Sequence, residues 1–352
     1  VEPKDAFANA GMLRPEEYVT QQTGSSFSDV HSFDPSSPVA VVLWFALVQV
    51  VSLTVAPTLM RYAGRAAGAV YGLSKPLSLV VLSLPIWLLV SSGMFTLSRE
   101  LVWTMLLLII GAAAWRAQRC SDEIRALFCT HKRTILAAEA VFISVFLFVI
   151  LLRATNPDMW HPWRGGEKPM ELAYLTAVTG STSLPPFDPW LAGGTLNYYY
   201  MGWFVLAVPI RLIGLGPDIG FNLGVATYAA LAAVTVFSTT AMLVELARRR
   251  SNRPANPAVT GVFAVVIFLV IGNLDGFRQL IMRLRNQLPL SDFDWWDPSR
   301  VNKNSAGFEV TEFPSFTVLF ADLHPHLMAM PFFGLGLAGS IAFIERARQS
   351  RV

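Results

Sequence analysis

The sequence predicts an all-α polytopic membrane protein with about seven transmembrane helices and further juxtamembrane helices on the outer side. The 352 residues are 53% hydrophobic and only 14% charged, whereas soluble domains carry about 25% charged residues. Apolar runs recur near the length of about 20 residues that a helix needs to cross a bilayer core. Basic residues cluster in alternate loops between these runs, as the positive-inside rule requires.

Seven apolar runs are the predicted spans. They cover residues 39–60, 76–97, 101–117, 134–152, 221–246, 258–271 and 327–344. An eighth run, 200–215, is short and contains Pro209 and Arg211. We interpret it as a helix on the outer interface, because a full span there would turn the arginines at 248–250 outward.

The basic clusters predict the orientation and the division of the chain. Arg61, Arg65 and Lys75 follow the first span, and five more basic residues precede residue 134. We therefore expect a cell-membrane protein with its N-terminus outside and its C-terminus in the cytoplasm. The predicted parts are an outer arm (1–37), a three-helix membrane segment (38–133) and a membrane core (134–352) with outer loops at 154–220 and 273–325.

Several functional classes are not indicated. The formal charge of +3 is modest and scattered, so we expect no nucleic-acid partner. Walker A, Gly-x-Ser-x-Gly and His-Glu-x-x-His motifs are absent from the sequence. Glu139 alone lies well inside a predicted span, which does not resemble a proton relay or voltage sensor. Cys120 and Cys129 flank a segment assigned to the cytoplasm, where a structural disulfide is not expected. The chain begins at Val1 without a secretory signal, and we interpret it as a processed product or a fragment.

The outer loop at 160–203 is the most informative segment. It carries Arg164, Glu167, Lys168, Glu171 and Asp188 among glycine, proline and aromatic residues. Membrane loops that only connect helices are usually short. A long loop with charges, rings and turn formers is more typical of a binding or catalytic loop.

Two carboxylate motifs stand in this loop. Glu167 and Glu171 are four residues apart and would share one helix face, and Pro169 between them suits a first helical turn. Such carboxylates act as a general base or hold a divalent cation, while complementing the helix dipole is the alternative. Asp188 precedes Pro189 in PPFDPW and projects from a fixed turn, with an Asx-turn as the alternative.

Asn197, Tyr198, Tyr199, Tyr200 and Trp203 form a predicted aromatic collar. Successive helical positions differ by about 100°, so the three tyrosines cannot all line one pocket. An aromatic belt at the membrane interface accounts for them. Stacking on a sugar ring or contact with a lipid phosphate is the alternative.

Asp322, His324 and His326 precede the last span in ADLHPH. Because Pro325 disfavours a regular helix here, an Asp-x-His-x-His turn can bring its side chains to one ion or phosphate. Helix capping or snorkelling is the alternative. Glu312 and Asp297 are further candidates, although neither has a spacing that requires it.

Long sequence blocks carry a family resemblance. GLSKPLSLVVLSLPIWLL, RATNPDMWHPWRGGEKPMELAYL, PPFDPWLAGGTLNYYYMGW and EFPSFTVLFADLHPHLMAMPF resemble the uncharacterised bacterial and archaeal YYY membrane family (DUF2298), named for its tyrosine triplet. The resemblance covers about residues 62–333. Glu171 departs from the aspartate expected in this family but keeps the carboxylate. Members typically continue with further spans, so the chain resembles their N-terminal portion.

The YYY family is in turn similar to the GT-C glycosyltransferases, which use polyprenyl-phosphate-linked sugars. This resemblance implies an acidic first outer loop with juxtamembrane helices. Residues 134–152 would then correspond to the first GT-C helix and 200–215 to a juxtamembrane helix, with three extra spans before this GT-C-like core.

The leading hypothesis is therefore a GT-C-type membrane glycosyltransferase that works at the outer face on a membrane lipid or lipid-linked sugar. Its predicted catalytic residues are Glu167, Glu171 and Asp188, and its predicted substrate and phosphate ligands are Arg164, Lys168, Asn197, Tyr198, Tyr199 and Tyr200. A divalent metal is the expected cofactor, held by Asp322, His324 and His326. The alternative is a non-catalytic integral membrane subunit that packs with other membrane subunits in a larger complex.

Overall fold

The computed structural model describes residues 37–155, 166–251, 255–271, 274–294, 296–300 and 312–349. In these residues the chain is helical, and the only β pairing is two isolated bridges, Phe187 with Thr195 and Arg300 with Glu312. The all-α membrane class is thus confirmed. Arg164 and all but the last residue of the predicted outer arm lie outside the described residues.

Seven helices coincide with the seven predicted apolar runs. They are α4 (Ser37–Ala63), α6 (Ser74–Ser91), α7 (Arg99–Arg119), α8 (Ser121–Thr155), α11 (Pro217–Ser251), α12 (Pro257–Leu269) and α15 (Pro325–Gln349). Four shorter helices lie between them, namely α9 (Lys168–Gly180), α10 (Met201–Ile213), α13 (Asp275–Arg285) and α14 (Pro314–Phe320). Single turns complete the order: η1 (Gly64–Ala66), α5 (Ala67–Val70), η2 (Tyr71–Leu73), η3 (Leu290–Asp292) and η4 (Asp297–Ser299).

Five helical stretches are long and apolar enough to cross a membrane: Pro38–Ser91, Arg99–Arg119, Ser121–Thr155, Pro217–Arg248 and Pro325–Arg348. The first contains both α4 and α6, joined through η1, α5 and η2. Helix α12 has 13 residues, which gives about 20 Å of helix against a hydrocarbon core of about 30 Å. The count of seven spans therefore stays a prediction.

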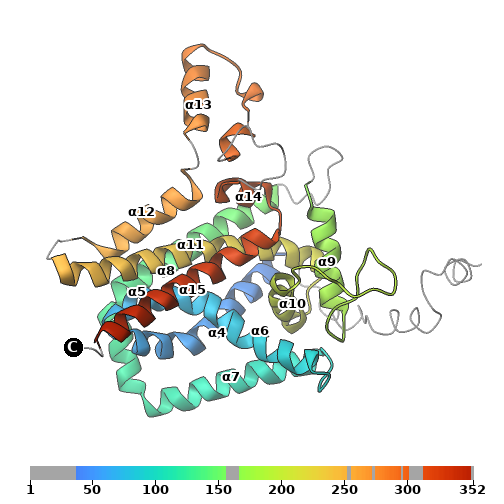
Figure 1. The fold of residues 1–352 in the computed structure, drawn as a ribbon, viewed down its shortest axis with the longest axis vertical. Helices are drawn as coiled ribbons and strands as arrows, with labels where there is room; N and C mark the ends of the chain where they lie inside the picture. Colours follow the sequence, from blue (N-terminus) through green and yellow to red (C-terminus); the bar gives the residue numbers. More distant parts are fainter. Residues whose placement is uncertain are drawn as a thin grey trace, which may run out of the picture.

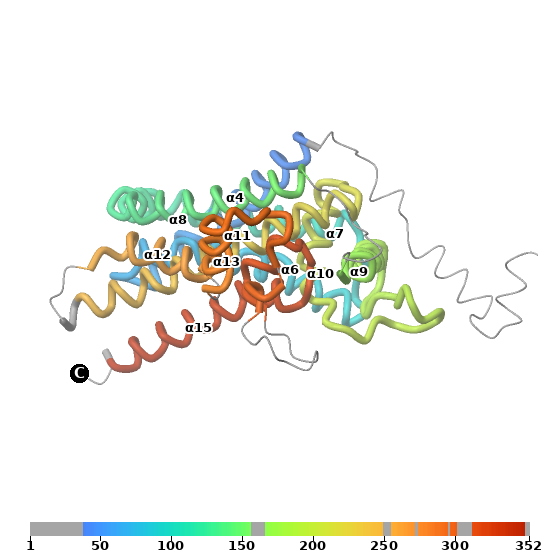
Figure 2. The backbone as a smooth tube through the Cα atoms, turned by 90° about the horizontal axis from the view of Figure 1, so that it is seen from above, coloured from blue at the N-terminus to red at the C-terminus, as the bar shows by residue number. Residues whose placement is uncertain are grey.

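Helix α11 is the centre of the bundle. It packs against α8, α12 and α15, and 67% of its most apolar window is buried, compared with 33% or less in the other stretches. Its run of alanines allows neighbouring backbones to approach closely. The long helices run side by side; α9, α10 and the start of α15 lie at one end, and the ends of α11 and α15 lie at the other (Figures 1 and 2).

Helix α10 forms within the predicted segment 200–215 and is too short to count among the candidate spans. It is buried against the rest of the protein from Trp203 to Leu212, and its place at the membrane interface stays a prediction. The buried Arg211 guanidinium donates to the carbonyl oxygens of Leu97 (2.9 Å) and Ser181 (2.7 Å). Buried charge that is hydrogen-bonded in this way does not need water.

Lys75 also differs from the prediction. It is not in a cytoplasmic loop but fully buried in the first turn of α6. Its Nζ lies 2.8 Å from Glu139 Oε1 on α8 and donates to Gln49 Oε1 on α4. Tyr71 also donates to Glu139. Ionisable groups inside a membrane bundle pair with one another because lipid cannot solvate them, and this network fastens α4 and α6 to α8.

Candidate functional site

The site begins at the first turn of α9, where Gly166 has a left-handed backbone (φ +62°). A Cβ atom there would lie 2.4 Å from Phe320 and 2.7 Å from Asp322 Oδ2. Glu167 precedes the helix and Pro169 stands in its first turn, a position where proline is favoured. The helix start predicted from GEKPME is therefore present, and only glycine allows it to approach the segment before α15.

That segment is a turn at residues 321–324. Ala321 has a left-handed backbone (φ +61°) and ends α14, and Pro325 begins α15. In this turn the Leu323 backbone N–H donates to Glu171 Oε2 at 2.6 Å. The contact joins residues that are 152 positions apart in the sequence.

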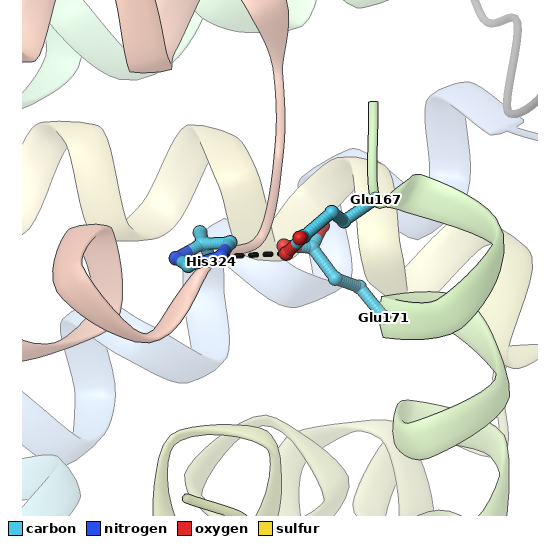
Figure 3. Close-up of side chains that lie close together, drawn as sticks. All are labelled: Glu167, Glu171 and His324. Carbon is cyan, nitrogen blue, oxygen red and sulfur yellow. Dashed lines mark hydrogen bonds and ion pairs between the residues drawn. The ribbon is translucent and has the colours of Figure 1, made fainter. Parts of the chain in front are cut away.

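Five side chains meet at this junction, and we call them the acid–imidazole cluster: Glu167, Glu171, Asp322, His324 and His326. His324 Nε2 lies 2.6 Å from Glu167 Oε2 (Figure 3). The Nδ1 atoms of His324 and His326 are 2.9 Å apart, so one ring donates and the other accepts. In either arrangement one proton lies between His324 and Glu167, which makes them an acid–base pair.

A chain of polar contacts continues from the cluster. His326 Nε2 is 3.0 Å from Thr317 Oγ1. When His326 Nε2 carries the proton and donates to Thr317, the Thr317 hydroxyl donates to Glu312 Oε2 at 3.3 Å. Glu312 forms a 2.9 Å ion pair with Arg300. Glu312 therefore joins the site, whereas Asp297 lies in a turn closed by Asp294. Sequence reasoning missed Thr317 and Arg300. Their signals were the EFPSFTVLFADLHPHLMAMPF block for Thr317 and the unusual FDWWDPSR segment for Arg300.

Burial controls the protonation of the acids. Glu171 is fully buried; mainly because of that burial, and then because of the Asp322 charge, its pKa is raised to about 9. Burial likewise raises the pKa of Asp322 to about 6, although the nearby Lys168 ammonium opposes the shift. Lys168 Nζ lies 3.9 Å from Asp322 Oδ1 and 4.4 Å from the centre of the Phe320 ring. At neutral pH Glu171 is therefore a buried neutral acid.

Three members of the cluster have the geometry of a metal site. Glu167, Glu171 and His324 each offer a ligand atom, and these atoms lie within 4.8 Å of one another. Glu171 Oε1 is buried and has no hydrogen-bond partner in the structure. Of the predicted metal ligands only His324 belongs to this set, because the Nδ1 atom of His326 faces His324. Glu167 and Glu171, predicted as catalytic residues, supply the other two ligand positions.

The remaining predicted residues lie around the cluster rather than in it. Asp188 Oδ1 accepts from the Trp190 backbone N–H at 2.8 Å, which is the Asx-turn alternative. Asn197 is exposed, and the Tyr200 hydroxyl is 3.1 Å from Trp87 Nε1 on α6. In the part of the chain that the structure describes, no hydrogen bond or ion pair joins these three side chains to the five cluster residues.

The first two tyrosines of the triplet lie closer to the site. Tyr198 stacks on Tyr174 and Trp203 at centroid distances of 5.4 and 5.8 Å. Its pKa is raised mainly by burial and next by the Glu167 charge, which places the ring near the cluster. Tyr199 is 72% exposed, and its ring centroid lies 5.1 Å from that of Tyr198. Tyr198 and Tyr199 are therefore neighbours, whereas the Tyr200 hydroxyl is directed to Trp87.

An apolar groove adjoins the cluster. It measures about 620 Å³ and is lined by Tyr199, Met201, Gly202, Pro325, His326, Met328, Ala329, Phe332 and Phe333. A Cβ at Gly202 would lie 2.6 Å from Met328 Sδ, so glycine lets α10 and α15 approach here. His326 belongs both to the groove and to the cluster. The groove therefore places an apolar surface directly beside ionisable groups.

These features define a polytopic helical membrane protein with a partly buried acid–imidazole site at one end of its bundle. The chain belongs to the family described as Uncharacterized membrane protein (DUF2298), whose model matches residues 81–352. This match confirms the predicted YYY-family membership. It includes all five cluster residues and begins within α6. Neither the curated proteins nor the solved structures contain a match to the chain.

Proposed function

We propose that the protein is a membrane glycosyltransferase that takes a polyprenyl-phosphate-linked sugar at the outer face of the cell membrane. The observation that carries this proposal is the position of the acid–imidazole cluster beside the apolar groove, with His326 shared by the two. A polyprenyl phosphate has an apolar chain, which would lie in the groove, and an anionic head, which would lie at the cluster. The outer orientation is supported by the arginine-bearing ends of α11 and α15, which lie at the end opposite the cluster (Figure 1).

The groove suits an isoprenoid chain. Met201, Met328 and Phe332 give it an apolar wall, and Phe333 beside them is 78% exposed. Methionine side chains adapt to irregular apolar ligands. In the proposed complex the lipid enters between α10 and α15, and its phosphate reaches the end of the groove at His326. Lys168 near Asp322 supplies positive charge on the other side of the cluster.

The Glu167–His324 pair is the proposed general base. The Glu167 side chain is exposed, so that an acceptor can reach it, and it already shares a proton with His324. In the reaction it takes the proton of an acceptor hydroxyl, whose oxygen forms the new bond to the anomeric carbon. The bond from that carbon to the phosphate oxygen breaks, and its electron pair leaves on the polyprenyl phosphate. Glu171, whose pKa is about 9, already holds its proton at neutral pH and therefore does not serve as the base.

A divalent cation fits the same arrangement. Carboxylate oxygens and an imidazole nitrogen are ordinary ligands of such ions, and Glu167, Glu171 and His324 present them together. The ion would supply positive charge to the leaving phosphate. Its binding would release protons from Glu171 and from the Glu167–His324 pair.

The test uses the full chain in proteoliposomes supplied with a radiolabelled polyprenyl-phosphate sugar, following release of polyprenyl phosphate. Glu167→Gln should lower turnover about 100-fold or more, within the usual range for loss of a general base. Ala329→Trp should fill the groove and weaken donor binding at least tenfold. The matched control is Ala247→Trp, because Ala247 lines an apolar pocket at the other end of α11 and α15.

Activity that resists EDTA would remove the cation from the proposal. If the wild-type chain neither binds nor turns over the donor, the glycosyltransferase proposal fails and the non-catalytic subunit is the better account. Equal effects of Ala329→Trp and Ala247→Trp would contradict the role of the groove.

A further inference from the structure

Helix α13 has an apolar face that no other described part of the chain covers. Phe277, Leu280 and Leu284 follow the i, i+3, i+7 spacing of one helix face and are 64%, 39% and 67% exposed. Leu274, immediately before the helix, is 71% exposed. An apolar stripe of this kind in an 11-residue helix is unusual on a surface that faces only water.

The polar side of the same helix is the side that holds it to the protein. Gln279 is buried and exchanges two hydrogen bonds with the Asp294 backbone, at 3.2 and 3.0 Å. Arg283 donates to the carbonyl oxygens of Pro289 and Asp292. The protein thus turns the apolar face of α13 outward, the reverse of what packing on a protein core would produce.

The direction of α13 matches a membrane surface. The helix lies across the direction of the long helices in Figure 1 and is seen nearly end-on in Figure 2. It follows α12, which also exposes apolar side chains. Phe263 is 61% and Ile267 49% exposed, and Val270, immediately after the helix, is 70% exposed. A helix that lies across the long helices and follows a helix with exposed apolar side chains has the orientation expected of a helix parallel to a membrane surface.

We propose that α13 is an interfacial helix that docks on the bilayer in which the protein sits, with a preference for anionic headgroups. Phe277, Leu280 and Leu284 enter the boundary between headgroups and acyl chains. The segment Asp275–Arg285 carries three arginines and one aspartate, so its charge complements a negatively charged lipid surface.

Docking of α13 also helps to hold the segment that follows it, residues 286–294 and 296–300, which reaches the candidate site. Helix α13 packs on η4, and η4 is followed directly by Arg300, which forms the ion pair with Glu312. A helix held at the membrane surface therefore keeps this segment beside α14. This inference concerns lipid contact alone and does not depend on glycosyl transfer.

The test places a fluorescent NBD label on a single cysteine in the full chain, after Cys120 and Cys129 are replaced by serine. One label stands at Phe277 and the matched control at Asn286, which is exposed and about 180° away around the helix. The protein is reconstituted in vesicles of phosphatidylcholine, with or without 30% phosphatidylglycerol. Quenching is measured with brominated lipid and with aqueous iodide.

We expect lipid quenching at position 277 at least threefold stronger than at 286, increasing with phosphatidylglycerol. Arg278→Gln with Arg285→Gln should abolish that increase, whereas Arg346→Gln at the end of α15 should not. Iodide quenching at 277 equal to that at 286 would overturn the proposal. Protection of 277 from both quenchers would overturn it too, since a protein would then cover the face. No response to phosphatidylglycerol would contradict the assigned role of the arginines.

Discussion

At the scale of single residues, Glu171 connects the fold with the proposed chemistry. One of its oxygens fixes the turn before α15 by accepting from Leu323, and the other has no hydrogen-bond partner in the structure. A buried acid in this position is stable only while it keeps its proton or exchanges it for a cation. The sequence indicated the carboxylate pair through the spacing of Glu167 and Glu171, but not which of the two would be buried.

Glu171 predicts a specific pH dependence of stability. Its folded pKa is raised to about 9 from an ordinary value of 4.5, so the folded state holds the proton more tightly than the unfolded state. Its contribution to stability is complete below pH 4.5 and is lost as the pH rises towards 9. Asp322 contributes with the same sign, but only up to about pH 6.

The measurement compares Glu171→Gln with the wild type by thermal unfolding in detergent without divalent cations. Between pH 6 and 9 the wild-type Tm should fall relative to that of the variant. Asp188→Asn is the control, because its carboxylate serves an exposed turn, and it should leave the profile unchanged. A constant difference between Glu171→Gln and wild type across this range would show that Glu171 does not bind a proton as described.

At the scale of elements, long-range contacts explain where sequence reasoning succeeded and failed. The start of α9 and the turn before α15 follow from local signals, namely Pro169 with its neighbouring glycines and Pro325 after ADLH. The meeting of these two elements does not, because no spacing encodes a contact across 152 positions. Lys75 was assigned to a cytoplasmic loop from its charge and its place after the first span. The segment with Arg211 was assigned to the outer interface from its short length, Pro209, Arg211 and the arginines at 248–250. Partners on other elements, Glu139 for Lys75 and backbone carbonyls for Arg211, allow both to be buried.

The network at Lys75 predicts a large loss of stability when one partner is removed. Lys75→Met leaves the half-buried Glu139 without its cation and should cost about 3–5 kcal/mol. The double variant Lys75→Met with Glu139→Gln should recover most of this loss. Arg61→Gln is the matched control, since its 3.1 Å pair with Glu123 is exposed and should contribute at most about 1 kcal/mol. Equal losses for Lys75→Met and Arg61→Gln in a detergent unfolding titration would contradict the fastening role of the network.

At the scale of the whole molecule, the two ends of the helical bundle differ in the side chains that they carry. One end gathers α9, α10, the cluster and the groove, and the other carries the basic ends of α11 and α15 (Figure 1). Composition and the spacing of apolar runs were sufficient to predict the helical membrane class and the positions of the seven apolar helices. The groove could not be predicted, because it arises from the close approach of α10 and α15 at Gly202. The family match adds membership but no activity.

We propose that the cluster and the groove together bind a lipid phosphate. An electron cryomicroscopy map of the full chain in nanodiscs containing polyprenyl phosphate tests it most directly. We expect elongated density along Met201, Met328 and Phe332, ending in a phosphate peak beside His326 at the acid–imidazole cluster. That density should disappear in Ala329→Trp. A groove filled by protein, or a phosphate peak away from the acid–imidazole cluster, would contradict the account.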